Sequence, residues 1–133
     1  MGKQKFVSKS EMKVSIIGEE DIVTGMVLAG MGHVDGQNKS NFFVVTSKTH
    51  PKQIEEKFNE FSSRDDLATI MITQTCADLI RPAVDAYSAT GRVIPTILEI
   101  PSKDQPYNPK NDPIMQRVAL FMPQAMEKLG VQT

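Results

Sequence analysis

The sequence predicts an α/β protein built around a small parallel sheet, and two observations support this prediction. First, four apolar runs of strand length recur along the 133 residues: VSIIG (14–18), NFFVVT (41–46), LATIMIT (67–73) and VIPTILEI (93–100). The first three are apolar on both faces, which is typical of parallel strands covered by helices. Second, helical patterns fill the gaps between the runs, and such alternation predicts right-handed crossovers.

The first two helices follow from apolar spacing. After the first run, apolar residues recur at i, i+1, i+4 and i+5, and the pattern fades at Gly30 and Gly32; these residues are Ile22, Val23, Met26 and Val27. After the second run, Pro51 suits a first helical position. An i, i+4, i+7 stripe follows, made of Ile54, Phe58 and Phe61.

The third helix is expected after residue 73. Thr75 and Asp78 stand where a capping box would place them, with Asp in place of the usual Glu. An apolar stripe follows, made of Leu79, Ile80, Ala83, Val84 and Tyr87. Pro82 lies inside this pattern and removes a hydrogen bond to the carbonyl of Asp78, so we expect a kink near Asp78.

The fourth run contains Pro95, which cannot donate to a strand ladder and therefore belongs to an edge strand. A strand order of 2-1-3-4 satisfies this requirement. The fold class expected is a flavodoxin-like or receiver-like α/β unit over residues 1–103, flanked by helices.

Residues 104–133 are expected to form a proline-rich loop and a C-terminal docking helix. The stretch PSKDQPYNPKNDP (101–113) holds four prolines in thirteen residues and is expected to be a loop. Asp112 and Pro113 then provide an N-cap and a first-turn proline. An amphipathic stripe follows, interrupted at Pro123, and consists of Ile114, Val118, Phe121, Ala125 and Leu129 with Met115, Met122 and Met126 beside it. This helix covers the sheet or reaches another protein.

Charge, apolar runs and cysteine count limit the classes of function that the sequence supports. The net charge of −1 gives no indication of nucleic-acid binding, and no apolar stretch approaches the roughly 20 residues that a membrane span needs. A single cysteine excludes an internal disulfide and fits a reducing compartment. The expectation is a cytosolic protein without membrane insertion.

The carboxyl ends of the predicted strands, where open parallel sheets bind ligands, offer little chemistry. Glu19, Glu20 and Asp21 follow the first run and would repel a phosphate, and residues 18–32 lack glycine-rich nucleotide motifs. A receiver-like Mg²⁺ site made of these three carboxylates remains an alternative, although the third run ends at Thr73 and Gln74 without an acceptor carboxylate. Asp65 and Asp66 lie before that run.

Other reactive side chains also lack a recognisable motif. Cys76 is interpreted as a buried structural cysteine, because the first strand should separate it from His50. His33 and His50 lack the spacing of a metal pair. Lys103, Asp104 and Tyr107 carry no specific signature. No catalytic, cofactor-binding or metal-binding residue is therefore expected.

Several stretches resemble one family. IIGEEDIVTGMVLAGMG, NFFVV, IEEKFNEF, FSSRDDLATIMI and above all ILEIPSKDQPYNPKNDPIMQRV resemble the F subunit of eukaryotic V-type proton-translocating ATPases, in the right order over residues 13–119. The loop HVDGQNKS is shorter than in those members, and the end beyond Val118 is less similar.

The resemblance implies a subunit that is not itself an enzyme and needs no cofactor. It implies a place on the rotary central stalk of the soluble sector, which couples ATP hydrolysis to proton transport, on the cytosolic face of vacuolar or endosomal membranes. The implied partners are the coiled-coil D subunit of the stalk, the catalytic A/B hexamer and a membrane-sector subunit that docks the stalk. The partner-binding residues expected are Ile114, Met115, Val118, Phe121, Met122 and Met126.

Overall fold

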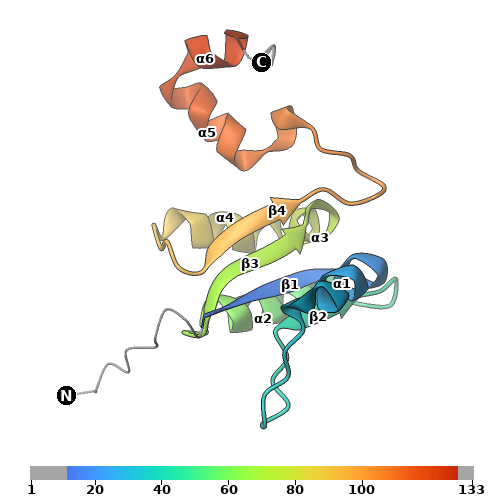
Figure 1. Cartoon of the computed structure of the whole chain (residues 1–133). Helices are drawn as coiled ribbons and strands as arrows, with labels where there is room; N and C mark the ends of the chain where they lie inside the picture. Colours follow the sequence, from blue (N-terminus) through green and yellow to red (C-terminus); the bar gives the residue numbers. More distant parts are fainter. Residues whose placement is uncertain (1–11, 129–133) are drawn as a thin grey trace, which may run out of the picture. The chain divides into compact units, whose positions relative to one another are not determined.

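The computed structural model describes residues 12–128, which form two compact units divided between Ser102 and Lys103. The first unit contains a sheet of four parallel strands in the order β2-β1-β3-β4, as the sequence predicts (Figure 1). The strands are β1 (Lys13–Glu19), β2 (Phe42–Val45), β3 (Leu67–Thr73) and β4 (Thr96–Ile100). Strand β4 lies at an edge, and Pro95 directly precedes it rather than falling within it. The ladder therefore loses no donor to the proline.

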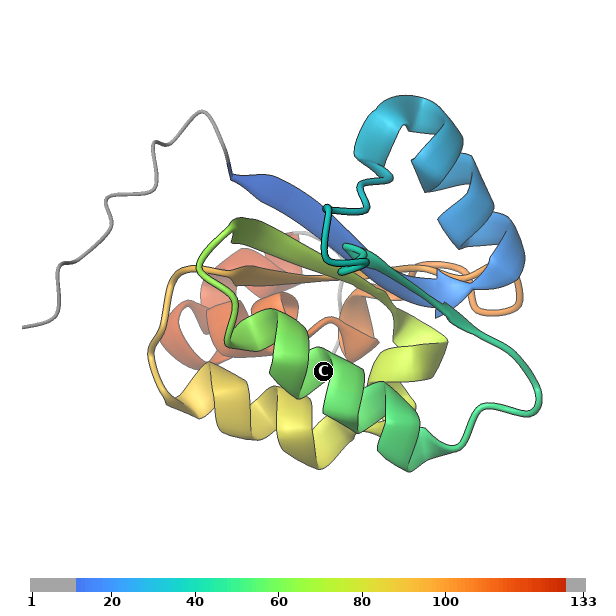
Figure 2. The ribbon, with the colours of Figure 1, turned by 90° about the horizontal axis from the view of Figure 1, so that it is seen from below.

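Helices cover the two faces of the sheet unequally (Figure 2). One face carries α1 (Glu20–Met26), which continues into the π-helical turn η2 (Val27–Met31). The other face carries α2 (Pro51–Ser62), α3 (Gln74–Leu79) and α4 (Arg81–Ala89). Gly30 lies inside η2, and its φ of 102° suits a residue without a Cβ.

The main core lies between the sheet and α2–α4. It contains the predicted stripe of α2, Ile54, Phe58 and Phe61, and the strand residues Ile17, Ile70 and Ile72. Phe58 meets the ring of Tyr87 edge-to-face at 6.0 Å. On the opposite face, the buried side chains Ile16 and Val23 mark the place where α1 packs on β1. Alternate residues of one strand thus serve both layers.

Local signals specify the start of α2. Pro51 occupies the first turn, as predicted, and His50 is the N-cap. The His50 Nδ1 atom accepts a hydrogen bond from the Lys52 N–H at 3.3 Å, and the His50 N–H donates to Gln53 Oε1 at 2.9 Å. This reciprocal pair is a capping box with histidine in the place of serine.

The third predicted helix is corrected by the structure in three respects. Thr73, not Thr75, is the N-cap of α3, and the Thr75 hydroxyl instead lies 2.9 Å from that of Ser102. The expected kink is a complete break at Ile80, because Pro82 falls in the first turn of α4, where no amide donor is needed. Leu79, predicted to belong to the core stripe, is exposed, whereas Ile80 and Val84 are buried.

The second unit is helical. A short 3₁₀ turn, η3 (Pro109–Asn111), interrupts the stretch predicted to be a loop. It leads into α5 (Pro113–Phe121) and α6 (Pro123–Lys128), so Pro123 separates two helices as expected. Asp112 caps α5 through its side chain, which accepts from the Ile114 N–H at 2.8 Å.

Candidate functional site

The carboxyl ends of the strands carry the carboxylates considered above as a metal site. Glu19 precedes α1 without forming a side-chain cap, and Asp21 Oδ1 accepts from the Ile22 N–H at 3.0 Å. Within residues 12–128, no group of three or more His, Cys, Asp or Glu side chains is placed to hold a metal ion. The described part of the chain therefore gives the receiver-like Mg²⁺ alternative no support.

Cys76 lies in the core at the first turn of α3, as interpreted from the sequence. Burial raises the pKa of its thiol, and the nearby Glu19 carboxylate adds to this shift. A raised thiol pKa disfavours the nucleophilic thiolate. Strand β1 lies between β2, which leads to His50, and β3, which leads to Cys76.

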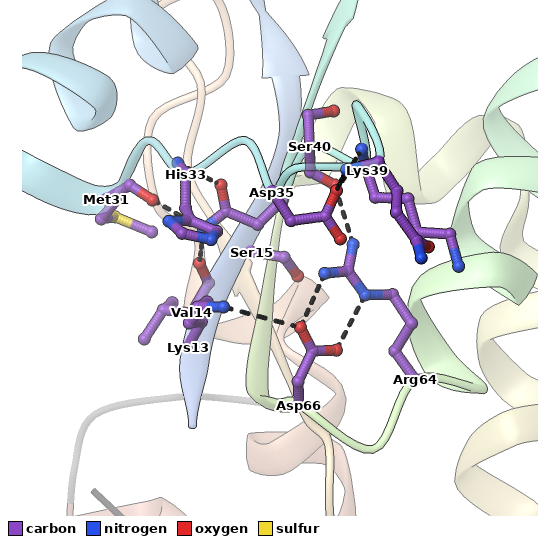
Figure 3. Close-up of polar contacts among 12 residues, drawn as sticks. Lys13, Val14, Ser15, Met31, His33, Asp35, Lys39, Ser40, Arg64 and Asp66 are labelled. Atoms are coloured by element: carbon purple, nitrogen blue, oxygen red, sulfur yellow. Dashed lines mark hydrogen bonds and ion pairs between the residues drawn. The ribbon is translucent and has the colours of Figure 1, made fainter. Parts of the chain in front are cut away.

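The amino end of the sheet is closed by an ionic cluster that the sequence did not reveal (Figure 3). The guanidinium of Arg64 donates to both Asp66 oxygens, at 2.9 and 2.7 Å, and to the Ser40 carbonyl at 2.8 Å. Lys13 Nζ lies 3.9 Å from the same carboxylate. The Arg64 hydrogen bond is the main reason that the pKa of Asp66 is lowered. These charges hold the Ser40 carbonyl, the 64–66 turn and the start of β1 together.

Asn41 fastens the segment before β2 to the sheet. This residue is buried, and its amide donates to the carbonyls of Val14 and Met31, at 2.8 and 2.6 Å. Its Oδ1 accepts from the His33 N–H at 2.7 Å. All three contacts are with backbone groups, so one side chain links the segment 31–33 and the start of β1 to the residue that precedes β2. The sequence offered one signal, a lone amide at the start of an apolar run.

The short loop HVDGQNKS is a tight turn organised by one side chain. Asp35 Oδ1 accepts from the N–H groups of Gln37 and Lys39, at 2.9 and 2.8 Å, and an isolated bridge joins Val34 to Ser40. The hydrogen bond from Lys39 is the largest cause of the lowered pKa of Asp35 (Figure 3). The Asp35 carboxylate therefore stabilises the conformation of the loop through hydrogen bonds within the loop itself.

The predicted partner-binding residues lie in the second unit. Ile114 and Phe121, on α5, are 60% and 85% exposed, and Met122, which directly follows α5, is 60% exposed; Met115 and Val118 are half-buried. Successive residues are about 100° apart around a helix, which places Ile114, Val118 and Phe121 on one side. Met126 belongs to α6, but its side chain, like all of Leu129, lies outside the described residues.

One exposed apolar residue of α5 was not selected from the sequence. Leu120 is 82% exposed and projects about 160° away from Val118 around the helix, between Gln116 and Arg117. Its position outside the apolar spacing explains why periodicity did not find it. The structure thus separates an apolar stripe from one apolar residue on the polar side.

No helix within residues 12–128 combines the length and the apolar character needed to cross a bilayer. The fold and the exposed residues define a class: a parallel α/β unit, followed by a helical unit with several exposed apolar side chains. Comparison with known proteins specifies the family. Residues 14–118 match the family described as ATP synthase (F/14-kDa) subunit.

Three relatives are each named as the F subunit of a V-type proton ATPase. The protein of Dictyostelium discoideum is 54% identical over 105 residues, which are 79% of this chain and 85% of that protein. The protein of Arabidopsis thaliana is 44% identical over 117 residues, 88% of this chain and 89% of the relative. The protein of Rattus norvegicus is 42% identical over 104 residues, 78% of this chain and 85% of the relative. The chain belongs to the family of V-type proton ATPase F subunits.

Among solved structures, the F subunit of the V-type ATP synthase from Archaeoglobus fulgidus is similar, with a TM-score of 0.48 and 21% identity. The match covers 68% of this chain and 98% of that one.

Proposed function

We propose that this chain is a non-catalytic subunit of a V-type proton ATPase and that it docks to the rotary central stalk through α5. Membership of the F-subunit family supports the place in the pump. The observation that supports docking is the exposed stripe: Ile114 and Phe121 are 60% and 85% exposed on the same side of one helix. Exposed apolar stripes of this kind mark protein interfaces.

The partner proposed for this stripe is the coiled-coil D subunit of the stalk. A coiled coil offers a groove between its helices, and an amphipathic helix binds such a groove through i, i+4 and i+7 side chains. Ile114, Val118 and Phe121 have this spacing. Methionines at 115, 122 and 126 suit an irregular groove, because the unbranched thioether side chain adapts its shape.

The wider role proposed follows from the family. The subunit strengthens the stalk that turns beside the A/B hexamer and meets the membrane-sector subunit that docks the stalk. Its place is the cytosolic face of vacuolar or endosomal membranes, and it uses no cofactor of its own. The charge of the chain, −1, makes attraction to anionic lipid an unsuitable basis for this location.

The test is assembly of the full chain with a coiled-coil partner. In the double variant Val118→Asp, Phe121→Asp, two carboxylates would be desolvated at the interface, so we expect affinity to fall by at least about 100-fold. The α/β unit should keep its thermal midpoint. The matched control is Leu120→Asp, on the polar side of the same helix, about 160° from Val118 and about 100° from Phe121, and about as exposed as Phe121. This variant should change affinity less than about threefold. Equal behaviour of the two variants would refute docking through the stripe.

An affinity pull-down of the tagged chain, followed by mass spectrometry, tests the place in the pump independently. We expect a coiled-coil subunit and a nucleotide-binding hexamer to be recovered with it. Recovery of the chain without them would contradict the stalk assignment.

A further inference from the structure

The motif DQPYNPKNDP (104–113) forms a compact polar structure at the start of α5. Within this motif, the Tyr107 hydroxyl donates a hydrogen bond to Asp112 Oδ2 at 2.8 Å. The other oxygen of the same carboxylate, Oδ1, accepts from the Ile114 N–H at 2.8 Å. A single side chain therefore joins the entering loop to the first turn of the helix.

A second set of hydrogen bonds lies beside this pair. Asn108 Oδ1 accepts from the Lys110 N–H at 3.0 Å and so caps η3. Gln116 Nε2, one turn into α5, donates back to the Lys110 carbonyl at 3.0 Å. Residues 107–116 are thus linked to one another by local hydrogen bonds from Tyr107 at one end to Gln116 at the other.

Prolines restrict the same segment in the unfolded chain. Pro109 and Pro113 occupy the first turns of η3 and α5, where their fixed φ suits the helix and their missing N–H groups are not needed. Proline at compatible positions lowers the entropy lost on ordering. All these features lie within the second unit and use no residue of the α/β unit.

We propose that residues 107–116 hold α5 in helical form before assembly, and that Tyr107 and Asp112 are the positioning residues of the docking helix. This inference rests on the proposed docking function. An isolated helix as short as α5 is marginal in water, and a partner would otherwise supply the free energy of ordering it. The apparent dissociation constant is the intrinsic constant divided by the fraction of the free chain in which α5 is helical. A helix that is already formed therefore keeps the apparent constant close to the intrinsic one.

The chemistry accounts for the choice of residues. The ionised Asp112 carboxylate accepts both bonds at once, and its negative charge lies at the amino end of α5, where the helix dipole favours it. A phenol is a good donor to a carboxylate, and this hydrogen bond is the main reason that the pKa of Tyr107 is raised. Tyr107 is itself 55% exposed, so it contributes through the bond rather than through burial.

The first experiment is hydrogen exchange on the full, unassembled chain. We expect the amides of Ile114 and Gln116 to be protected, because the first bonds Asp112 Oδ1 and the second bonds the Asp112 carbonyl. In Tyr107→Phe their exchange should accelerate about two- to fivefold. In Asp112→Ala it should accelerate further, since the bonds of the carboxylate with Tyr107 Oη and with the Ile114 N–H are both lost. Tyr87→Phe is the matched control: it removes a phenol hydrogen bond in the α/β unit, to the Pro95 carbonyl at 2.6 Å, and should leave these amides unchanged.

The second experiment compares affinities for the coiled-coil partner. In Tyr107→Phe the dissociation constant should rise in inverse proportion to the fraction of the free chain in which α5 stays helical, with the thermal midpoint of the α/β unit unchanged. Free-chain amides that exchange at random-coil rates, or that ignore Tyr107→Phe, would overturn pre-ordering even if the docking variants behave as proposed. Protected amides with no effect of Val118→Asp, Phe121→Asp on assembly would instead refute docking alone.

Discussion

Arg81 holds Glu99 in a bidentate ion pair, with Nη1–Oε1 and Nη2–Oε2 distances of 2.7 and 3.2 Å, and so ties the start of α4 to the edge strand β4. The same guanidinium also donates to Asp78 at the end of α3. These bonds raise the pKa of Arg81, Glu99 being the largest cause. Two short helices, separated at Ile80, are thereby held to one strand.

Removing this guanidinium should be costly. In Arg81→Met, the Glu99 carboxylate, whose side chain is only 14% exposed, keeps its charge without its partner. We expect the free energy of unfolding to fall by about 1–3 kcal/mol, measured by urea denaturation. Asp78→Asn is the comparison: that side chain is 52% exposed, and the loss should be below about 0.5 kcal/mol. Similar losses in both variants would contradict a main role for Glu99.

Asp66 should make the α/β unit acid-sensitive. Its folded-state pKa is lowered, chiefly by the Arg64 hydrogen bond, so its contribution to stability is present above the unfolded pKa of about 3.9. That contribution disappears as the pH falls below about 4 and through the folded value. Asp66→Asn should therefore show a flatter decline in stability between about pH 5 and 2 than the natural chain.

The control for this titration is the exposed neighbour Asp65. Urea midpoints for Asp65→Asn should follow the pH profile of the natural chain. The account fails if Asp66→Asn keeps the full acid dependence.

Two glycines of the first unit should respond oppositely to alanine. A Cβ on Gly18 would lie 2.7 Å from Thr73 Cγ2, on the neighbouring strand, so Gly18→Ala should cost about 1–3 kcal/mol. A Cβ on Gly25 would meet nothing within 4 Å and lies inside α1, where alanine should stabilise by about 0.5–1 kcal/mol. Thermal denaturation of both variants checks this, and a destabilised Gly25→Ala would argue against α1 as described.

Replacing Asn41 by aspartate, which has nearly the same shape, should destabilise the α/β unit. In Asn41→Asp, the carboxylate retains the bond from the His33 N–H but faces the carbonyls of Val14 and Met31 without a proton to donate. We expect a loss of about 2–4 kcal/mol at neutral pH, which shrinks as the pH falls and the carboxyl becomes protonated. A loss that is independent of pH would show that the two donated bonds contribute little.

The sheet was predictable from the sequence because its signals are local. Apolar runs located the strands, and the order 2-1-3-4 was chosen because it satisfies an edge position for the fourth run. The order is confirmed, although Pro95, the reason given for the edge, lies just before β4 rather than within it. The stripe of α2 was predictable for the same reason, since helical spacing alone brings Ile54, Phe58 and Phe61 to one face.

The predictions failed where the conformation or the contacts of a residue depend on residues distant in the sequence or on the ends of the helices. Thr75 has the sequence appearance of a cap, but its hydroxyl pairs with Ser102, which local rules cannot anticipate. Leu79 follows the helical spacing of Ile80, yet the break at Ile80 separates the two residues into different elements. Asn41 escaped notice because its partners, Val14 and Met31, lie far away in the chain. On α5, spacing indicated the stripe but could not show that its residues are exposed.

The position of β1 has a consequence for synthesis on the ribosome. This strand is made first among the four, yet it lies inside the sheet, and Lys13 pairs with Leu67 only after β2 and α2 have been made. Such non-local pairing is slow, since a long loop must close before any bond forms. The nascent chain therefore emerges with an apolar segment, VSII, that has no strand beside it. One edge can pair only after β2 has been made, and the other only after β3 has been made. Translation speed through residues 20–73 sets how long that strand stays open to chaperones or to mispairing.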